Sequence, residues 1–524
     1  MPGTPHDRRD IAPRGRGIVT AATALGEPGW QRLDPRMLAV TPLRQVAGFL
    51  PVIAVVLLTG IGQDIAGRVY SVLGGVLVVL LAGLLRWVTT RYRITGERVE
   101  LRTGLVFRST RSVARDRIRS VDVTAGLVHR LFQLSVVKVG TGERTDGRES
   151  RELTLDAISA AEADRVRQRL LDPRDTEPPD RCTVPAGTEL AALRWSWLRF
   201  APLTVSSLVA LVAVAGVVGQ LISDVGANAV DVGGVREKLT SAPLWVGIAA
   251  FAALVLVIAP AGSLLIFIEA WWGFTLVREP GGTLRIRRGL FTTRSVSLEE
   301  RRLRGVEVIE PPLLRVGRGA RTVAVATGLG GRRGHGRGTL LPPAPHPEAH
   351  RVAGVVLEED PSPTATTLRR HPLVALRRRL VRATVPVLAG SATLWLTPVP
   401  AWVAWAALGL LPAAVLLALD AYRNLGHALT SKYLVTRHGA GVRGTVALQR
   451  AGVIGWTVSQ SFFQRRAGLV TVTATTAAGH GGYSVIDVAT AEGLALAEQA
   501  VPGLREPFVR HDVSGAGHTL GSMA

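Results

Sequence analysis

The stretch Tyr92-Arg-Ile-Thr-Gly-Glu-Arg-Val-Glu-Leu-Arg-Thr-Gly-Leu105 alternates apolar and polar residues on both sides of a glycine. Alternation with a period of two predicts β-strands with one buried face, and the glycine between them predicts a turn. Phe274 to Leu290 repeats this pattern, and Tyr433-Leu-Val-Thr-Arg437 repeats its first strand. Three copies of one strand pattern predict three modules of one repeated type.

Farther along each copy, other segments recur in the same order. Arg117-Ile-Arg-Ser-Val121 is echoed by Arg302-Leu-Arg-Gly-Val306, and each copy ends in a predicted helix. Several short strands closed by one helix predict a small barrel or sandwich with the helix as its cap. The third copy is shorter between its first strand and its later arginine, which predicts a lost turn or part of a strand. The positions that define the repeat are Tyr92, Ile118, Arg130, Leu303, Arg315, Tyr433 and Arg465.

Long uncharged runs precede each module. A bilayer core needs about 20 apolar residues in a helix, and two prolines, Pro398 and Pro400, would divide the last run into two helices. We therefore expect six transmembrane helices in three hairpins, each followed by one strand-rich module. The runs are Gln45 to Gln63, Val69 to Leu85, Phe200 to Ser223, Leu239 to Ile268 and Ala383 to Leu419.

The charge distribution predicts the orientation in the membrane. The chain has 62 Lys and Arg against 40 Asp and Glu, a net charge of +22, and arginines cluster beside the ends of the apolar runs. Loops on the cytoplasmic side of a membrane carry an excess of Lys and Arg. The sequence therefore predicts a multi-pass inner-membrane protein with both termini and all three modules in the cytoplasm.

These residues resemble a known family. A membrane hairpin followed by Tyr-x-Ile-Thr at Tyr92, a Gly-Leu turn at Gly104, Arg-x-Arg-Ile-x-Ser-Val ending at Val121 and Arg-Leu-x-x-Leu at Arg130 is similar to the bacterial pleckstrin-homology (PH) family once called DUF304, or bPH2. The triplicated arrangement resembles the YdbT-like form of that family. The resemblance implies a PH-like fold, a bent antiparallel β-barrel with a C-terminal helix. It also implies pairing with a shorter one-module PH-like membrane protein.

The expected domain boundaries follow from the runs and the repeat. They are an N-terminal tail at 1–36, transmembrane hairpin 1 at 37–90, module 1 at 91–171, a linker at 172–193, hairpin 2 at 194–273, module 2 at 274–357, a linker at 358–375, hairpin 3 at 376–422, the divergent module 3 at 423–501 and a C-terminal tail at 502–524. Both tails are predicted to be disordered.

The search for catalytic or metal chemistry gives weak candidates. His346 and His350 are four residues apart, but no HExxH pattern or second cysteine besides Cys182 accompanies them. The glycine-rich stretch from Gly328 to Gly338 lacks the Gly-Lys-Ser/Thr ending of a phosphate loop. Glu269 and Asp420 fall at the ends of apolar runs, where we interpret them as solvated residues. We therefore expect no catalytic residue, no metal and no cofactor.

Arginines near the membrane remain as candidate contacts with anionic lipid headgroups: Arg91, Arg93, Arg117 and Arg119. Nucleic-acid binding is not expected, because the aromatic residues that stack on bases are few. The leading hypothesis is a non-enzymatic membrane scaffold whose cytoplasmic modules bind proteins, with lipid as a second ligand. The alternatives are a transporter or exporter component, which Pro260, Gly262 and Pro386 weakly favour, and an enzyme for lipid-linked substrates.

Overall fold

The computed structural model contains two compact units, residues 1–116 and 117–524. It describes residues 29–38, 40, isolated positions between 74 and 85, 87–95, 97–104, 108–118, 120–140, 153–171, 187–204, 216, 243–328 and 338–502. The predicted runs Gln45 to Gln63, most of Val69 to Leu85 and most of Phe200 to Ser223 lie outside these residues. So do most of the two predicted tails and of the linker at 172–193.

The first unit holds one antiparallel sheet with the strand order β1-β2-β3-β4. Tyr92 and Val99 are buried on one face, as the alternating sequence requires. On the other face the guanidinium of Arg93 bonds Glu100 at 2.8 Å, and Arg93 and Arg102 both lie over the ring of Trp30. The strands are β1 (Gln31–Arg32), β2 (Arg91–Ile94), β3 (Arg98–Thr103) and β4 (Ser109–Ala114).

The second unit begins with the last three strands of module 1, which share a seven-stranded sheet with the first strands of module 2. The strand order is β7-β6-β5-β11-β10-β9-β8, and all neighbours are antiparallel. The strands are β5 (Ser120–Ala125), β6 (Leu134–Gly140), β7 (Leu153–Ser159), β8 (Thr188–Ala192), β9 (Thr275–Glu279), β10 (Thr283–Arg288) and β11 (Thr293–Glu299). The helices beside them are α3 (Leu127–Leu131), α4 (Ala160–Leu171), η2 (Trp195–Leu203) and α7 (Leu244–Trp271).

A second shared sheet, also antiparallel throughout, joins module 2 to module 3 in the same way. Its order is β14-β13-β12-β17-β16-β15, and module 3 ends in a separate sheet of order β18-β19-β20. The strands are β12 (Leu303–Glu310), β13 (Gly319–Ala326), β14 (Thr339–Pro345), β15 (Gly426–Leu429), β16 (Tyr433–His438), β17 (Arg443–Gln449), β18 (Gly455–Ser459), β19 (Leu469–Thr475) and β20 (Gly482–Ala489). The helices are α8 (Pro312–Val316), α9 (His346–Leu357), η4 (Pro363–Ala365), α10 (Leu373–Trp395), α11 (Ala401–Leu408), α12 (Leu411–Arg423), α13 (Phe462–Arg466) and α14 (Thr490–Ala500).

Each module therefore contributes its first strands to one sheet and its last strands to another. Short 3-10 helices mark the crossing points: η1 (Arg115–Arg117), η3 (Glu300–Arg302) and η5 (Arg450–Gly452). In module 2, Leu276, Leu284 and Leu298 on the first strands share one core with Val306 and Val308 on the last strands. The C-terminal helix α9 closes that core with Val352 and Val356. This arrangement is consistent with the PH-like β domains that the family resemblance implies.

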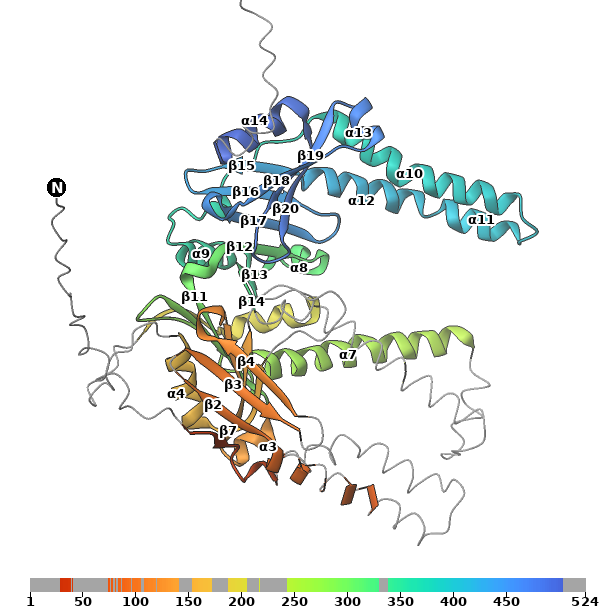
Figure 1. Cartoon of the computed structure of the whole chain (residues 1–524). Coiled ribbons are helices and arrows are strands. Elements are labelled where there is room, and N and C mark those ends of the chain that lie inside the picture. Colours follow the sequence, from red (N-terminus) through yellow and green to blue (C-terminus); the bar gives the residue numbers. More distant parts are fainter. Residues whose placement is uncertain are drawn as a thin grey trace, which may run out of the picture. The chain divides into compact units, whose positions relative to one another are not determined.

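The expectation of six transmembrane helices is wrong for this structure. Among the described residues one helix is long and apolar enough to cross a membrane, Ala401–Arg423, which comprises α11 and α12. The apolar segment Leu256–Trp271 of α7 is shorter. Helix α10 carries Arg377, Arg378, Arg379 and Arg382 in its first half, so only its second half is uninterrupted by charge. Figure 1 shows α10 running beside α11 and α12, and Ser391 Oγ donates to the carbonyl oxygen of Ala404 at 2.9 Å between them.

The joint between modules 2 and 3 gives a first prediction. An added Cβ at Gly305 would lie 2.2 Å from the carbonyl oxygen of Ala447 on β17, whereas one at Gly455 on β18 would meet nothing within 4 Å. Real Cβ atoms do not approach backbone oxygen that closely, so the strands must separate. We expect Gly305→Ala to lower the thermal unfolding temperature of the detergent-solubilised protein and Gly455→Ala to leave it unchanged. Equal unfolding temperatures for the two variants would contradict this packing.

Candidate functional site

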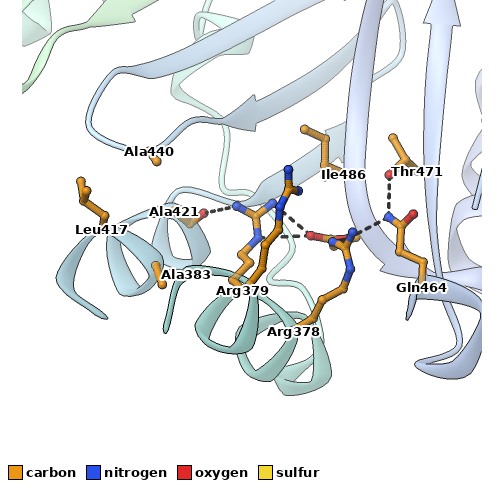
Figure 2. Close-up of a pocket in the computed structure, with 12 residues that line it drawn as sticks. Arg378, Arg379, Ala383, Leu417, Ala421, Ala440, Gln464, Thr471 and Ile486 are labelled. Atoms are coloured by element: carbon orange, nitrogen blue, oxygen red, sulfur yellow. Dashed lines mark hydrogen bonds and ion pairs between the residues drawn. The ribbon is translucent and has the colours of Figure 1, made fainter. Parts of the chain in front are cut away.

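A cavity of about 530 Å³ lies where α10 and α12 meet module 3. Its lining is basic on the α10 side and apolar on the α12 side. Figure 2 shows Arg378 and Arg379 of α10 reaching toward the strands of module 3, where Gln464 of α13 approaches from the other side. The lining residues are Arg378, Arg379, Arg382, Ala383, Leu417, Ala418, Ala421, Ala440, Gln464, Thr471, Ile486 and Asp487.

The centre of this site is the carboxylate of Asp487, whose side chain is 1% exposed. Arg378 donates to its Oδ1 at 2.5 Å, and Arg379 contacts its Oδ2 at 3.1 Å. Gln464 donates to Oδ1 at 2.9 Å. A buried carboxylate is costly unless charged donors surround it, and here two guanidinium groups and an amide supply them. Asp487 therefore joins helix α10 to the sheet of module 3.

Backbone conformation places Asp487 there. Its φ is +60°, at a register shift in the pairing of β19 with β20. Such a bulge turns one side chain away from the regular alternation of the strand, and Asp is among the residues that best tolerate the left-handed region. Ala157 has the same conformation, φ +58°, at the corresponding place in module 1. The bulge is thus a feature of the repeat, whereas the carboxylate on it is specific to module 3.

Gln464 is held by the start of α13. Ser461 caps that helix, since its Oγ accepts from the Gln464 backbone N–H at 3.3 Å and the Gln464 side chain accepts from the Ser461 N–H at 2.9 Å. This reciprocal capping box fixes the amide in place. The Gln464 Nε2 then donates to both Thr471 and Asp487, each at 2.9 Å.

A buried histidine pair lies behind Asp487. His371 Nδ1 is 3.2 Å from the Asp487 carbonyl oxygen, and His371 Nε2 is 3.1 Å from His427 Nδ1. Burial, followed by the charge that His371 would carry, lowers the pKa of His427 to about 4. Burial also lowers the pKa of His371. Both rings are therefore neutral at pH 7, and one must donate to the other.

A second contact secures the base of α12. Arg315 of α8 forms two hydrogen bonds with Asp420, at 3.0 and 2.8 Å, and the backbone N–H of Gly441 donates to the same carboxylate at 2.9 Å. The interpretation of Asp420 as a solvated residue is therefore wrong. Asp420 connects the apolar helix to modules 2 and 3, and its role is structural.

The predicted repeat positions fall on the core and on the joints between modules. Tyr92, Ile118, Leu303 and Tyr433 are buried. Arg130 donates to the carbonyl oxygen of Leu290 at 2.5 Å, and Arg315 donates to that of Gly441 at 3.1 Å. Each arginine thus donates to a backbone carbonyl of the following module. Leu290 lies on the turn before β11, and Gly441 lies on the turn before β17. Arg465 is exposed.

The predicted lipid contacts are scattered. Arg91 and Arg117 are exposed, Arg93 is bound to Glu100, and Arg119 lies outside the described residues. The structure does not gather them into one pocket within either unit. His346 and His350 are adjacent, with their Nε2 atoms 3.1 Å apart, but no group of three metal-ligating side chains occurs among the described residues.

Sequence reasoning missed the site around Asp487. Arg378 and Arg379 belong to the arginines that were interpreted as setting the orientation in the membrane. No sequence pattern links them to a carboxylate more than a hundred residues later. The available signal was the pair Gln464 and Asp487, two polar residues at positions where the repeat places His129 and Ala157 in module 1 and Leu314 and Pro343 in module 2.

The charge on Asp487 gives a second prediction. Asp487→Asn keeps the shape and the tolerance for a positive φ but leaves two largely buried arginines without their anion, which typically costs about 3–5 kcal/mol. We expect a marked loss of thermal stability for the detergent-solubilised protein. The matched control is Glu189→Gln, an exposed carboxylate on β8, for which we expect no change. A stability equal to that of the control would show that the ion pairs contribute nothing.

The histidine pair gives a third prediction. Since folding lowers the pKa of His427 from 6.5 to about 4, the unfolded chain binds more protons between these values. Stability is therefore fully present above pH 6.5 and is lost as the pH falls toward 4, by about 2 kcal/mol at pH 5 for one such histidine. The charged neighbours Glu492, which raises the pKa, and Arg369, which lowers it, are already included in this shift.

Thermal unfolding between pH 5 and 7.5 measures this effect. We expect His427→Gln to reduce the pH dependence. His350→Gln is a matched comparison, because burial and the adjacent His346 lower the pKa of His350 to about 4 as well. A pH dependence that neither substitution changes would rule out both pairs as its source.

Comparison with known proteins agrees with the architecture. A family model described as "Bacterial PH domain" matches residues 40–174 and 383–499. The UPF0699 transmembrane protein YdbT of Bacillus subtilis (strain 168) is 32% identical over 96 residues, which are 18% of this chain. The match spans only 19% of the length of YdbT. No solved structure matches significantly.

These matches confirm the resemblance to the bacterial PH family and to its YdbT-like form, on residues that include the start of module 1 and the strands of module 3. The second match includes Gln464 and Asp487 of the cavity lining, but it begins at residue 383, after Arg378, Arg379 and Arg382. An apolar helix of spanning length, Ala401–Arg423, lies within the second match. In both matched segments the chain is similar to bacterial PH-domain proteins, and the relative from Bacillus subtilis is named a transmembrane protein.

Proposed function

We propose that the chain is a non-enzymatic, membrane-anchored scaffold whose PH-like modules bind proteins on the cytoplasmic side and contact anionic lipid headgroups. The observation that carries the proposal is the basic cavity at the base of the apolar helices. There one module is fastened to the membrane anchor through Asp487, Arg378 and Arg379. A shorter one-module PH-like membrane protein remains a candidate partner.

The joints between modules support the scaffold role. Across the joint of modules 2 and 3, Arg443 pairs with the buried Glu310. Across the joint of modules 1 and 2, the buried Arg167 of α4 bonds Glu279 at 2.9 Å and Ser297 at 3.1 Å. Continuous sheets with paired charges resist bending at the joints. The array can therefore present several surfaces at fixed spacing, which is what a scaffold requires.

The base of the anchor favours contact with a lipid surface. Arg382 is exposed, lines the cavity and has no hydrogen-bond or ion-pair partner among the described residues. The Nε atom of Arg378 is buried and likewise has no partner there. Phe462 and Phe463 on α13 are 69% and 71% exposed, beside Arg465 and Arg466. Aromatic residues flanked by arginines suit an interface with anionic headgroups, and arginines at this end favour the cytoplasmic leaflet.

A fluorescent probe tests the lipid contact and gives a fourth prediction. The single Cys182 is replaced by Ser, Phe463 is replaced by Cys, and the thiol carries an environment-sensitive dye. In nanodiscs we expect a larger blue shift with phosphatidylglycerol than with phosphatidylcholine alone, because the arginines attract the anionic surface. Arg382→Gln should reduce the difference between the two lipids.

The matched control places the dye at Ser431, an exposed position on the turn between β15 and β16. We expect no lipid-dependent shift there. If the dye at position 463 reports the same aqueous environment in both lipids, the headgroup contact is wrong. Crosslinking in the native membrane followed by affinity capture tests the protein-binding role. Recovery of no specific protein partner, with lipid or solute alone retained, would overturn the scaffold.

A further inference from the structure

The two joints between modules use one register. In the first, Ser120 of β5 pairs with Leu298 of β11, and in the second Gly305 of β12 pairs with Leu448 of β17. Ser120 and Gly305 are each the third residue after the 3-10 helix of their module. Leu298 and Leu448 are each the second residue before the 3-10 helix of the next module. The same antiparallel pairing is therefore built twice from equivalent positions.

Two strands that are equivalent to the strands at the joints do not form a joint among the described residues. β18 is the module 3 counterpart of β5 and β12, and β4 is the module 1 counterpart of β11 and β17. Each lies at the edge of its own sheet and pairs with only one neighbour among the described residues. The last three residues of β18 and the first four of β4 are exposed, whereas β12 and β17 are mostly buried. Unpaired edges of this kind bind further strands.

The residues around β18 match those at the completed joints. Arg130 and Arg315 lie on the short helix after β5 and β12 and bond a turn of the incoming module. Arg465 occupies the same position on α13 and is exposed. Its side chain has no hydrogen-bond or ion-pair partner among the described residues. At the positions of β4 that this register makes equivalent to Val296-Ser-Leu298 of β11, the chain has Arg111-Ser-Val113. Equivalent positions for a third joint are therefore present on both strands, with the arginine of the joint on the β18 side.

We propose that the free edge of β18 pairs with strand β4 of a second copy of this chain. The register of the two existing joints assigns Gly455 to Val113 and, two residues along, Thr457 to Arg111. Each copy has one edge of each kind, so the contact is head to tail and can close reciprocally in a dimer or continue into longer assemblies. This inference rests on the proposed scaffold role and names a partner for it, but the lipid measurement does not depend on it.

Disulfide crosslinking in membranes tests the pairing. Two differently tagged chains, both with Cys182→Ser, are co-expressed, one with Thr457→Cys and the other with Arg111→Cys. Residues directly opposite in antiparallel strands have Cα atoms about 4.5–5.5 Å apart, within the range that a disulfide spans. We expect mild oxidation to give a linked dimer that carries both tags. The off-register control pairs Thr457→Cys with Ala114→Cys, for which we expect only the background of a single-cysteine chain.

A second variant keeps the proposal testable without cysteines. An added Cβ at Gly455 meets nothing within 4 Å in one chain. The equivalent positions at the two joints hold only small residues, Ser120 and Gly305, and Gly305 lies against its partner strand. We expect Gly455→Val to leave the thermal stability of the dilute protein unchanged and to abolish the crosslink. In detergent, the unsubstituted protein should have the particle mass of a dimer or larger assembly, and Gly455→Val should have that of a single chain. Equal crosslinking of the two register pairs would overturn the proposal. So would a disulfide that forms only when both cysteines are in one chain, or the trapping of a different protein by Cys at position 457.

Discussion

The pairing of edge strands between successive modules is the constraint on which the second unit depends. A PH-like module made of two small sheets leaves two strand edges with unpaired N–H and C=O groups, and burying them without partners is costly. At each joint the last strands of one module supply those partners to the first strands of the next. The core of module 2 continues into residues of module 3, including Tyr433 and Val435. The modules are consequently not structurally independent domains. Removing one would expose an unpaired strand edge of its neighbour.

The anchor is coupled to this array by charge rather than by apolar packing alone. Asp487 holds the basic end of α10, and Asp420 at the end of α12 is held by Arg315 of module 2. Asp487 lies on β20 and Asp420 near the end of α12, and each accepts hydrogen bonds from another element. A displacement of the helices would therefore have to break ion pairs at two modules, which makes the base of the anchor a stiff connection.

The sequence alone could predict the repeat but not its partition into sheets. Alternation around Tyr92 and Tyr433 identifies strands, and the recurrence of Arg130, Arg315 and Arg465 identifies equivalent positions. Nothing local states that β5 pairs with β11, because edge pairing depends on which strand lies nearest in space. The six-helix expectation failed for a related reason. The last predicted run begins at Ala383, after the four arginines in the first half of α10. Two of these, Arg378 and Arg379, are bound by Asp487, which lies far along the chain.

Module 3 was expected to be the divergent copy, because Tyr433 to Arg450 is shorter than Tyr92 to Arg115. The expected loss of a turn or part of a strand is wrong, because Tyr433 begins β16, the second of the strands β15 to β17 that precede η5, just as β2 to β4 precede η1. At two equivalent buried positions, however, module 1 has His129 and Ala157, module 2 has Leu314 and Pro343, and module 3 has Gln464 and Asp487. Buried polar groups destabilise a core unless every donor and acceptor is matched. Here Arg378 of α10 and Gln464 of α13 both donate to Asp487. A module under no structural constraint would not be expected to keep this complete set of hydrogen bonds around Asp487. The two polar residues of module 3 join it to α10. Of the two equivalent pairs, only that of module 2, Leu314 and Pro343, is wholly apolar.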